Sequence, residues 1–118
     1  MHYPLTEDLF LFPETTQYED LSIWEEPESI VAEAAVPGVK KEDISIRFEQ
    51  GILSIEAKRK PEKTRTYHQR AQHHFSYLSA IPGEIDEQTK PEASLSNGLL
   101  NIRFMKRRRA IAQKIHVK

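Results

Sequence analysis

The chain has 118 residues, of which 38% are hydrophobic and 30% charged, with a formal net charge of −1. This length allows one domain with a small core, so burial between subunits would add to its stability. Because the chain has no cysteine, a disulfide framework and a thiolate zinc site are excluded. Neither a signal peptide nor an apolar run of about 18 residues is present, so we expect a cytoplasmic protein that spans no membrane.

The two parts of the chain carry opposite charge. Residues 1–56 hold 13 acidic and three basic side chains, a net charge of −10, whereas residues 57–118 hold five acidic and 14 basic ones, a net charge of +9. Opposite charge blocks favour head-to-tail association, although both could equally be solvated faces of one monomer.

Residues 1–19 are expected to form a short N-terminal arm. Its one apolar cluster consists of Leu9, Phe10, Leu11 and Phe12. Four apolar side chains are too few for a core of their own. They could dock on the domain or inside an oligomer, or remain exposed as a patch that binds other chains.

Alternation of apolar and polar side chains between Leu21 and Phe104 predicts half-buried β-strands. The expected strands begin at Leu21, cover 29–36, 44–49, 53–57 and 75–81, and flank Asn97-Gly98. Asn97-Gly98 is the strongest short hairpin signal, and the short loop Glu49-Gln50-Gly51 predicts a second hairpin. About seven short strands without a convincing amphipathic helix predict an all-β antiparallel sandwich over 20–105. Residues 84–90 could form one helical turn.

Two segments stand apart from this pattern. The basic segment 58–70 is predicted to be a loop, within which Thr64, Arg65, Thr66, Tyr67 and His68 could form a short edge strand. Residues 106–118 are expected to form an extended C-terminal tail. Ile115 and Val117 lie two residues apart, so both project to the same side of an extended chain, with nothing local to bury them.

In their order along the chain, these motifs resemble the α-crystallin domain of small heat shock proteins. The likeness covers about 20–117 and rests on 35–44 (AVPGVKKEDI), 51–60 (GILSIEAKRK), Tyr67-His68, Phe75 with Ile81-Pro82, Ala93 with 97–100, and 115–117 (IHV). The resemblance implies an immunoglobulin-like β-sandwich. It also implies an ATP-independent chaperone (a holdase) that binds partly unfolded clients, works as a dimer-based homo-oligomer and needs no cofactor.

The resemblance also implies the roles of three segments. Ile115 and Val117 are expected to enter an apolar groove beside a sheet edge of a neighbouring subunit, although the tail could instead fold back on its own domain or hang free. The segment 64–68 is expected to pair with an edge strand of a partner in a strand-swapped dimer; otherwise it is a mobile surface loop. Leu9 to Phe12 would bind clients or contact other subunits.

The chain departs from the family at positions that often help to hold the dimer. Tyr77 stands where an arginine is usual, and Ala71 stands where an acidic residue is expected. These replacements put the usual ion pairing there in question. The short arm puts large oligomers in question, and His116 replaces a frequent proline, which makes the tail less rigid.

Other functions have weaker support. One alternative is a p23-like co-chaperone module that binds a folded partner. Another is a nucleic-acid binder that uses the basic run 106–109, which lacks interleaved aromatic residues. His68, His73 and His74 are expected to be surface residues rather than metal ligands, because adjacent histidines on a strand point to opposite faces. Without a phosphate-binding loop or a nucleophile elbow, the chain is not expected to be an enzyme.

Overall fold

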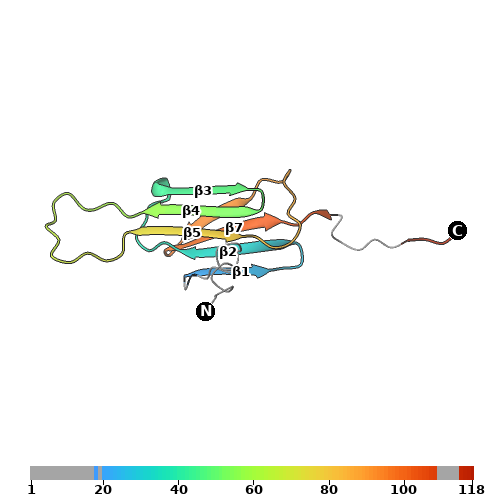
Figure 1. Cartoon of the computed structure of the whole chain (residues 1–118), viewed down its shortest axis with the longest axis horizontal. Coiled ribbons are helices and arrows are strands. Elements are labelled where there is room, and N and C mark those ends of the chain that lie inside the picture. The colour runs from blue at the N-terminus through green and yellow to red at the C-terminus, as the bar shows by residue number, and fades with distance from the viewer. Residues whose placement is uncertain (1–17, 19, 109–114) are drawn as a thin grey trace, which may run out of the picture.

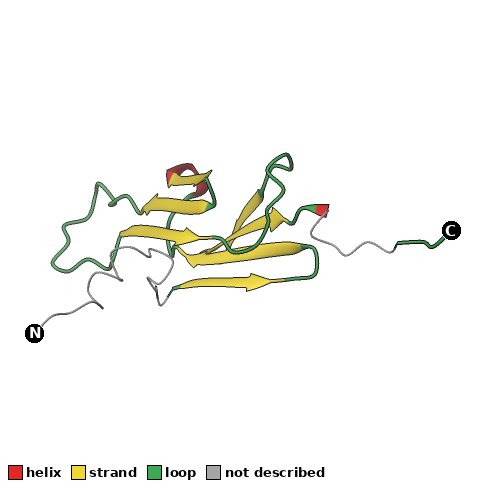
Figure 2. Ribbon diagram, turned by 45° about the vertical axis from the view of Figure 1, so that its right-hand side comes forward, coloured by secondary structure: helices red, strands yellow, loops and turns green. Residues whose placement is uncertain are grey.

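The computed structural model describes residues 18, 20–108 and 115–118. In this part of the chain, seven strands form two antiparallel sheets that face each other (Figures 1 and 2). The four-stranded sheet has the order β1-β2-β7-β6, and the three-stranded sheet has the order β3-β4-β5. The strands are β1 (Leu21–Glu25), β2 (Ser29–Ala35), β3 (Ile44–Glu49), β4 (Ile52–Lys58), β5 (His74–Ala80), β6 (Glu92–Ser96) and β7 (Leu99–Met105), and a short 3-10 helix η2 (Lys41–Asp43) leads into β3. The predicted all-β antiparallel sandwich is confirmed.

Two tight turns set the register of two hairpins. Asn97 and Gly98 have φ angles of 52° and 78°, and Gln50 and Gly51 have φ angles of 51° and 79°. Two consecutive residues with positive φ form the two-residue turn whose twist matches that of paired strands. They join β6 to β7 and β3 to β4, so that Ser96 pairs with Leu99. Both predicted hairpins are present.

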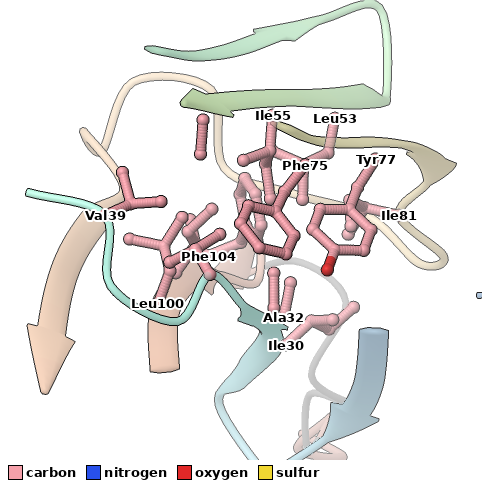
Figure 3. Packing of buried hydrophobic residues seen from close by; sticks show 14 of the residues in the cluster. Ile30, Ala32, Val39, Leu53, Ile55, Phe75, Tyr77, Ile81, Leu100 and Phe104 are labelled. Carbon is pink, nitrogen blue, oxygen red and sulfur yellow. The ribbon is translucent and has the colours of Figure 1, made fainter. Parts of the chain in front are cut away.

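The core lies between the sheets and follows from the alternation of side chains. Figure 3 shows side chains of both sheets pointing toward one another, among them Ile55 and Phe75 from one sheet and Ile30 and Phe104 from the other. Complete burial of an aliphatic or aromatic side chain contributes about 1.5–3 kcal/mol. The largest side chains of this core that are almost fully buried are Phe104, Ile30, Leu53, Ile55, Ile102 and Val36.

Val31 explains why β2 reads as a nearly continuous apolar run. Its neighbours Ile30 and Ala32 face the core, so Val31 lies on the outer face of the sheet, yet it is only 1% exposed. Its cross-strand partners are Trp24 on β1 and Arg103 on β7. These two long side chains flank Val31 and shield it from water.

Two local expectations differ from the structure. Residues 84–90 form a turn and an isolated bridge between Ile85 and Lys106, not a helical turn, because the backbone of this segment pairs with residues that follow β7. Residues 64–68 form no strand in the single chain and belong to a long loop between β4 and β5 that extends beyond the sandwich (Figure 1). Within the described ranges, no helix has the length and apolar character needed to cross a membrane.

Candidate functional site

The two sheets leave two long sides of the sandwich, and these sides differ in how the chain closes them. On one side β3 lies opposite β6, and on the other side β5 lies near β1 and the end of β2. We call the first the β3/β6 side and the second the β1/β5 side. In the part of the chain that the structure describes, an apolar groove lies on the first side.

The groove on the β3/β6 side has a volume of about 650 Å³. Ile46 and Phe48 reach into it from β3, Ala93 from β6, and Phe104 from β7. Phe48 packs against Phe104 with ring centroids 4.6 Å apart, yet Ile46 and Phe48 remain only half-buried. The groove therefore offers apolar surface that its own chain covers incompletely. The complete lining is Ile46, Phe48, Gln50, Leu53, Ile85, Asp86, Glu87, Thr89, Lys90, Pro91, Ala93, Ile102 and Phe104.

The connection between β5 and β6 forms the polar end wall of this groove. Asp86 holds the wall in a tight turn, since its carboxylate accepts hydrogen bonds from Thr89 Oγ1 at 2.6 Å and from the Gln88 amide at 3.0 Å. These bonds, the Thr89 hydroxyl first, lower the pKa of Asp86 from its usual 3.8. The turn stays folded without a helix because one carboxylate satisfies several donors.

The side chains of Ile115 and Val117 are 86% and 96% exposed. The described part of their own chain therefore does not cover them, and the alternative that the tail folds back on its own domain does not describe this structure. The expected contact with a neighbouring subunit stays a prediction. Sequence reasoning identified this apolar pair but not the side chains of the groove. The alternation in 44–49 showed that Ile46 and Phe48 face inward, but it could not show that the sandwich is open beside them.

On the β1/β5 side, Tyr77 closes the sandwich. Its ring is 6% exposed and meets the ring of Tyr18 edge-on, with centroids 5.3 Å apart. Its hydroxyl donates a 2.6 Å hydrogen bond to the carbonyl oxygen of Ala35 at the end of β2. Burial raises the pKa of Tyr77, and the nearby Asp20 carboxylate adds to this shift. Position 77 therefore makes its contacts within the chain and offers no charge to a partner.

The predicted dimer segment, Thr64 to His68, is exposed throughout. Tyr67 closes the loop locally: its hydroxyl accepts a hydrogen bond from the Glu62 amide at 3.3 Å, and the Arg70 guanidinium lies 5.5 Å from its ring centroid. Hydrogen bonding by the Glu62 amide, and then by the Arg65 side chain, lowers the pKa of Tyr67. Ala71, which replaces the expected acidic residue, is exposed in the same loop.

The basic run 106–109 is partly neutralised. Lys106 pairs with Glu25, and Arg107 Nη1 lies 3.3 Å from Glu84 Oε1. Arg109 lies outside the described residues. Because two of the four cations are held against the domain, the run offers less charge to a nucleic acid than its sequence suggests.

Of the three histidines, His74 makes a side-chain contact within the domain. His74 Nε2 lies 2.9 Å from Glu56 Oε1, and Ser76 donates a 2.5 Å hydrogen bond to the other carboxylate oxygen. The Ser76 hydroxyl, followed by His74, lowers the pKa of Glu56. Nδ1 of His73 is buried without a hydrogen-bond partner in the described structure. Among residues 18, 20–108 and 115–118, no three potential ligands of the His, Cys, Asp or Glu type gather at one place.

The remaining predicted contact, Leu9, Phe10, Leu11 and Phe12, lies outside the described residues. The boundary of the predicted arm, 1–19, falls in the same region.

Comparison with known proteins gives one consistent match. The model of the Hsp20/alpha crystallin family matches residues 22–118. Heat shock protein 16 of Schizosaccharomyces pombe is 32% identical over 93 residues, which cover 73% of this chain and 64% of that protein. The 17.4 kDa class I heat shock protein of Oryza sativa subsp. japonica is 37% identical over 87 residues, which cover 67% of this chain and 55% of that protein. The chain thus spans less than two thirds of these curated relatives.

Solved structures agree with this match. The crystal structure of a small heat-shock protein from Xylella fastidiosa has a TM-score of 0.64 and 31% identity, with 87% of this chain and 99% of that chain covered. Heat shock protein 16.0 of Schizosaccharomyces pombe has a TM-score of 0.64 and 26% identity, with 87% and 85% covered. Neither the p23-like alternative nor the nucleic-acid alternative finds support in these matches.

Proposed function

The chain belongs to the Hsp20/alpha crystallin family, and from this premise we propose that it is an ATP-independent chaperone subunit that binds partly unfolded proteins as a dimer-based oligomer. The observation that carries the proposal is the pairing of an apolar groove with an exposed apolar pair, Ile115 and Val117, on the same chain. A subunit that presents both a ligand and its receptor can bind a second copy of itself.

We call the contact of Ile115 and Val117 with the groove of a neighbouring subunit the clasp, and we expect it to be weak. In an extended segment, Ile115 and Val117 point together into the groove of a neighbour, while His116 points away to solvent. Burial of each apolar side chain contributes about 1.5–3 kcal/mol before the cost of ordering the tail. One clasp is therefore reversible, and several clasps in one assembly hold it together by avidity.

The loop contact uses a different edge of the sandwich. Among the described strands, β1 is the end strand of its sheet, and its outer edge is the one that we propose for pairing with Thr64 to His68 of a partner. Charge supports this choice of edge. The loop carries Arg59, Lys60, Lys63, Arg65 and Arg70 against Glu62, whereas Asp20, Glu25, Glu26 and Glu28 lie in or beside β1. Of these four carboxylates, Glu25 and Glu26 already pair with Lys106 and Arg103, so Asp20 and Glu28 carry the charge argument. Opposite charges steer the two segments together and fix which edge is used.

Client binding completes the proposal. Leu9 to Phe12 and the groove offer apolar surface when contacts between subunits open. Apolar attraction strengthens on warming, and capture of unfolded chains removes them from aggregation by mass action without ATP.

The test compares Ile115→Ala/Val117→Ala with the control His116→Ala. We expect the double variant to sediment as smaller species, because it loses two buried side chains per clasp, and to protect a heat-denatured client less well. His116→Ala should leave both readouts unchanged. An unaltered sedimentation profile for the double variant would refute the clasp.

One deletion and one set of substitutions test the other two contacts separately. Removal of residues 64–68 should abolish the dimer, and a stable dimer after this deletion would exclude strand exchange. Replacement of Leu9 to Phe12 with serine should abolish suppression of client aggregation. Full protection by that variant would exclude the arm as the client site.

A further inference from the structure

The first residues of the C-terminal tail are built into the wall of the groove. Beyond the end of β7, Lys106 forms an antiparallel bridge with Ile85. The Asp86 amide donates a 2.8 Å hydrogen bond to Met105 O, and the Arg107 amide donates a 3.0 Å hydrogen bond to the carbonyl oxygen of Glu84. We call residues 105–107 the tail root. The tail root and residues 84–86 thus form a short two-stranded ladder.

The side chain of Arg107 reinforces this ladder. Its Nε donates a 3.1 Å hydrogen bond to the carbonyl oxygen of Ile85, and its Nη1 pairs with Glu84 Oε1 at 3.3 Å. A guanidinium can serve a carbonyl and a carboxylate at once because its donors are fixed in one plane. Arg107 therefore fastens the tail root to the segment between β5 and β6.

The same segment is the end wall of the groove. Ile85 is 8% exposed, packs into the core and lines the groove, and Asp86 lines it beside Ile85. Asp86 also folds the turn that brings Thr89 into the lining. Any side chain that enters this end of the groove therefore contacts the residues to which the chain's own tail root is bound.

We propose that Arg107 is a positioning residue that couples occupation of the groove to fixation of the subunit's own tail root. When the tail root is bound to residues 84–86, these residues are already ordered. A tail that enters the groove then binds without the entropy cost of ordering them. Coupling between two sites is reciprocal. A tail from a neighbouring subunit that contacts Ile85 and Asp86 therefore also stabilises the tail root of the subunit to which it binds. In an oligomer, a subunit whose groove is occupied therefore has a fixed tail root, and its own tail leaves the domain in one direction. Binding of one tail then favours binding of the next, so assembly is cooperative. This inference rests on the proposed binding of the tail in the groove.

The test uses the full chain with Ile115→Ser/Val117→Ser, so that its own tails do not compete. A fluorescent peptide with the sequence of residues 109–118 is titrated onto this protein, and its affinity is read from anisotropy. Adding Arg107→Ala should weaken peptide binding by about five-fold or more, the lower range of measured coupling between sites. Arg107→Lys keeps a cation beside Glu84 but loses the planar fork, so it should recover part of the affinity. The adjacent exposed Arg108→Ala is the matched control and should change affinity by less than about two-fold.

Hydrogen exchange gives a second readout in the protein that retains Arg107. Saturation with the peptide should slow exchange of the Asp86 and Arg107 amides, both of which donate to the ladder. A peptide that carries serine at positions 115 and 117 should have no such effect.

The outcomes distinguish this inference from the proposed function. If the natural peptide binds no better than the serine peptide, both the clasp and the coupling are wrong. If the natural peptide binds but Arg107→Ala has no effect on its affinity and exchange at Asp86 is unchanged, the clasp stands and the coupling is wrong.

Discussion

The two long sides of the sandwich differ in how completely the chain's own residues cover the apolar core between the sheets. On the β1/β5 side, Tyr77 fills the gap between the sheets and its hydroxyl satisfies the carbonyl of Ala35. On the β3/β6 side, Ile46 and Phe48 stay half-buried above a groove of about 650 Å³. The chain closes one side with its own residues and leaves the other side apolar and open.

This difference teaches that two sides of one sandwich can differ in how completely they bury apolar side chains, beside single exposed apolar residues elsewhere such as Trp24 and Leu78. A domain of this size buries a limited fraction of its apolar surface. The groove brings the half-buried Ile46 and Phe48 together in one place, and an extended segment with two apolar side chains is the ligand that we propose for it. We expect the closed side to supply stability and the open side to supply association.

The largest expected effect comes from opening the closed side. Tyr77→Ala removes a buried aromatic side chain and leaves the Ala35 carbonyl without its donor, so the free energy of unfolding should fall by about 3–5 kcal/mol. Tyr77→Phe keeps the ring and should cost about 1–3 kcal/mol for the unpaired carbonyl. Both values are measured by denaturant unfolding at fixed protein concentration, with the fluorescence of Trp24, the single tryptophan, as the signal.

Leu78→Ala on the outer face of the same strand is the control for this pair. Leu78 is 45% exposed, so its truncation should cost less than about 1 kcal/mol. Equal losses for Tyr77→Ala and Leu78→Ala would show that the β1/β5 side is not closed by Tyr77.

The second prediction closes the open side. Ala93 points from β6 into the groove, and Ala93→Phe should fill it as Tyr77 fills the opposite side. We expect the affinity for the tail peptide to fall at least about ten-fold, equivalent to about 1.4 kcal/mol, while the free energy of unfolding is retained. Sedimentation should show smaller species.

Ser94→Phe adds the same ring on the outer face of β6, since Ser94 pairs with Asn101 while Ala93 pairs with the buried Ile102. This variant should keep the oligomer of the unaltered protein. If Ser94→Phe and Ala93→Phe have the same effect on sedimentation, the groove is not the site of assembly.

The smallest expected effect on the free energy of unfolding comes from Glu56, which lies on the outer face of a sheet, away from both the β1/β5 side and the β3/β6 side. Hydrogen bonds from Ser76 and then His74 hold the pKa of Glu56 below its usual 4.5. A carboxyl group whose pKa is lower in the folded state stabilises the fold above pH 4.5, and this contribution is lost as the pH falls through the folded pKa. Glu56→Gln should therefore cost at most about 1 kcal/mol at pH 7, since the pair is exposed.

The pH dependence is measured by repeating the unfolding experiment at decreasing pH. The difference between the unaltered protein and Glu56→Gln should shrink below pH 4.5, the usual pKa of the group. Ser76→Ala removes the main cause of the shift and should reproduce part of the effect. A difference that grows on acidification contradicts the assignment.

Much of the fold could be predicted from local sequence. The strands follow from apolar and polar side chains that alternate every two residues, and the turns at Asn97-Gly98 and Gln50-Gly51 follow from residues that tolerate positive φ. These signals act over a few residues, so a linear reading finds them. The same reading found Ile115 and Val117 as apolar residues without local cover.

Some features of the sites could not be predicted in this way. The sequence marked Tyr77 as a departure, but its role depends on Ala35, a residue 42 positions away. The basic run appeared free in the sequence, yet Lys106 and Arg107 bind residues far back along the chain, Glu25 and Glu84. The segment 64–68 has the residues of a strand but forms none alone, because a strand requires an edge with which to pair.

The sequence alone therefore determined which residues form strands, where the chain turns and which end carries uncovered apolar side chains. Only the tertiary structure decided which side of the sandwich is closed, which is open, and how the tail root is tied to the groove wall. The physical reason is the distance along the chain between the residues that interact. Backbone conformation and side-chain alternation depend on neighbours in sequence, whereas burial, hydrogen-bond partners and grooves depend on which distant strands the fold brings together.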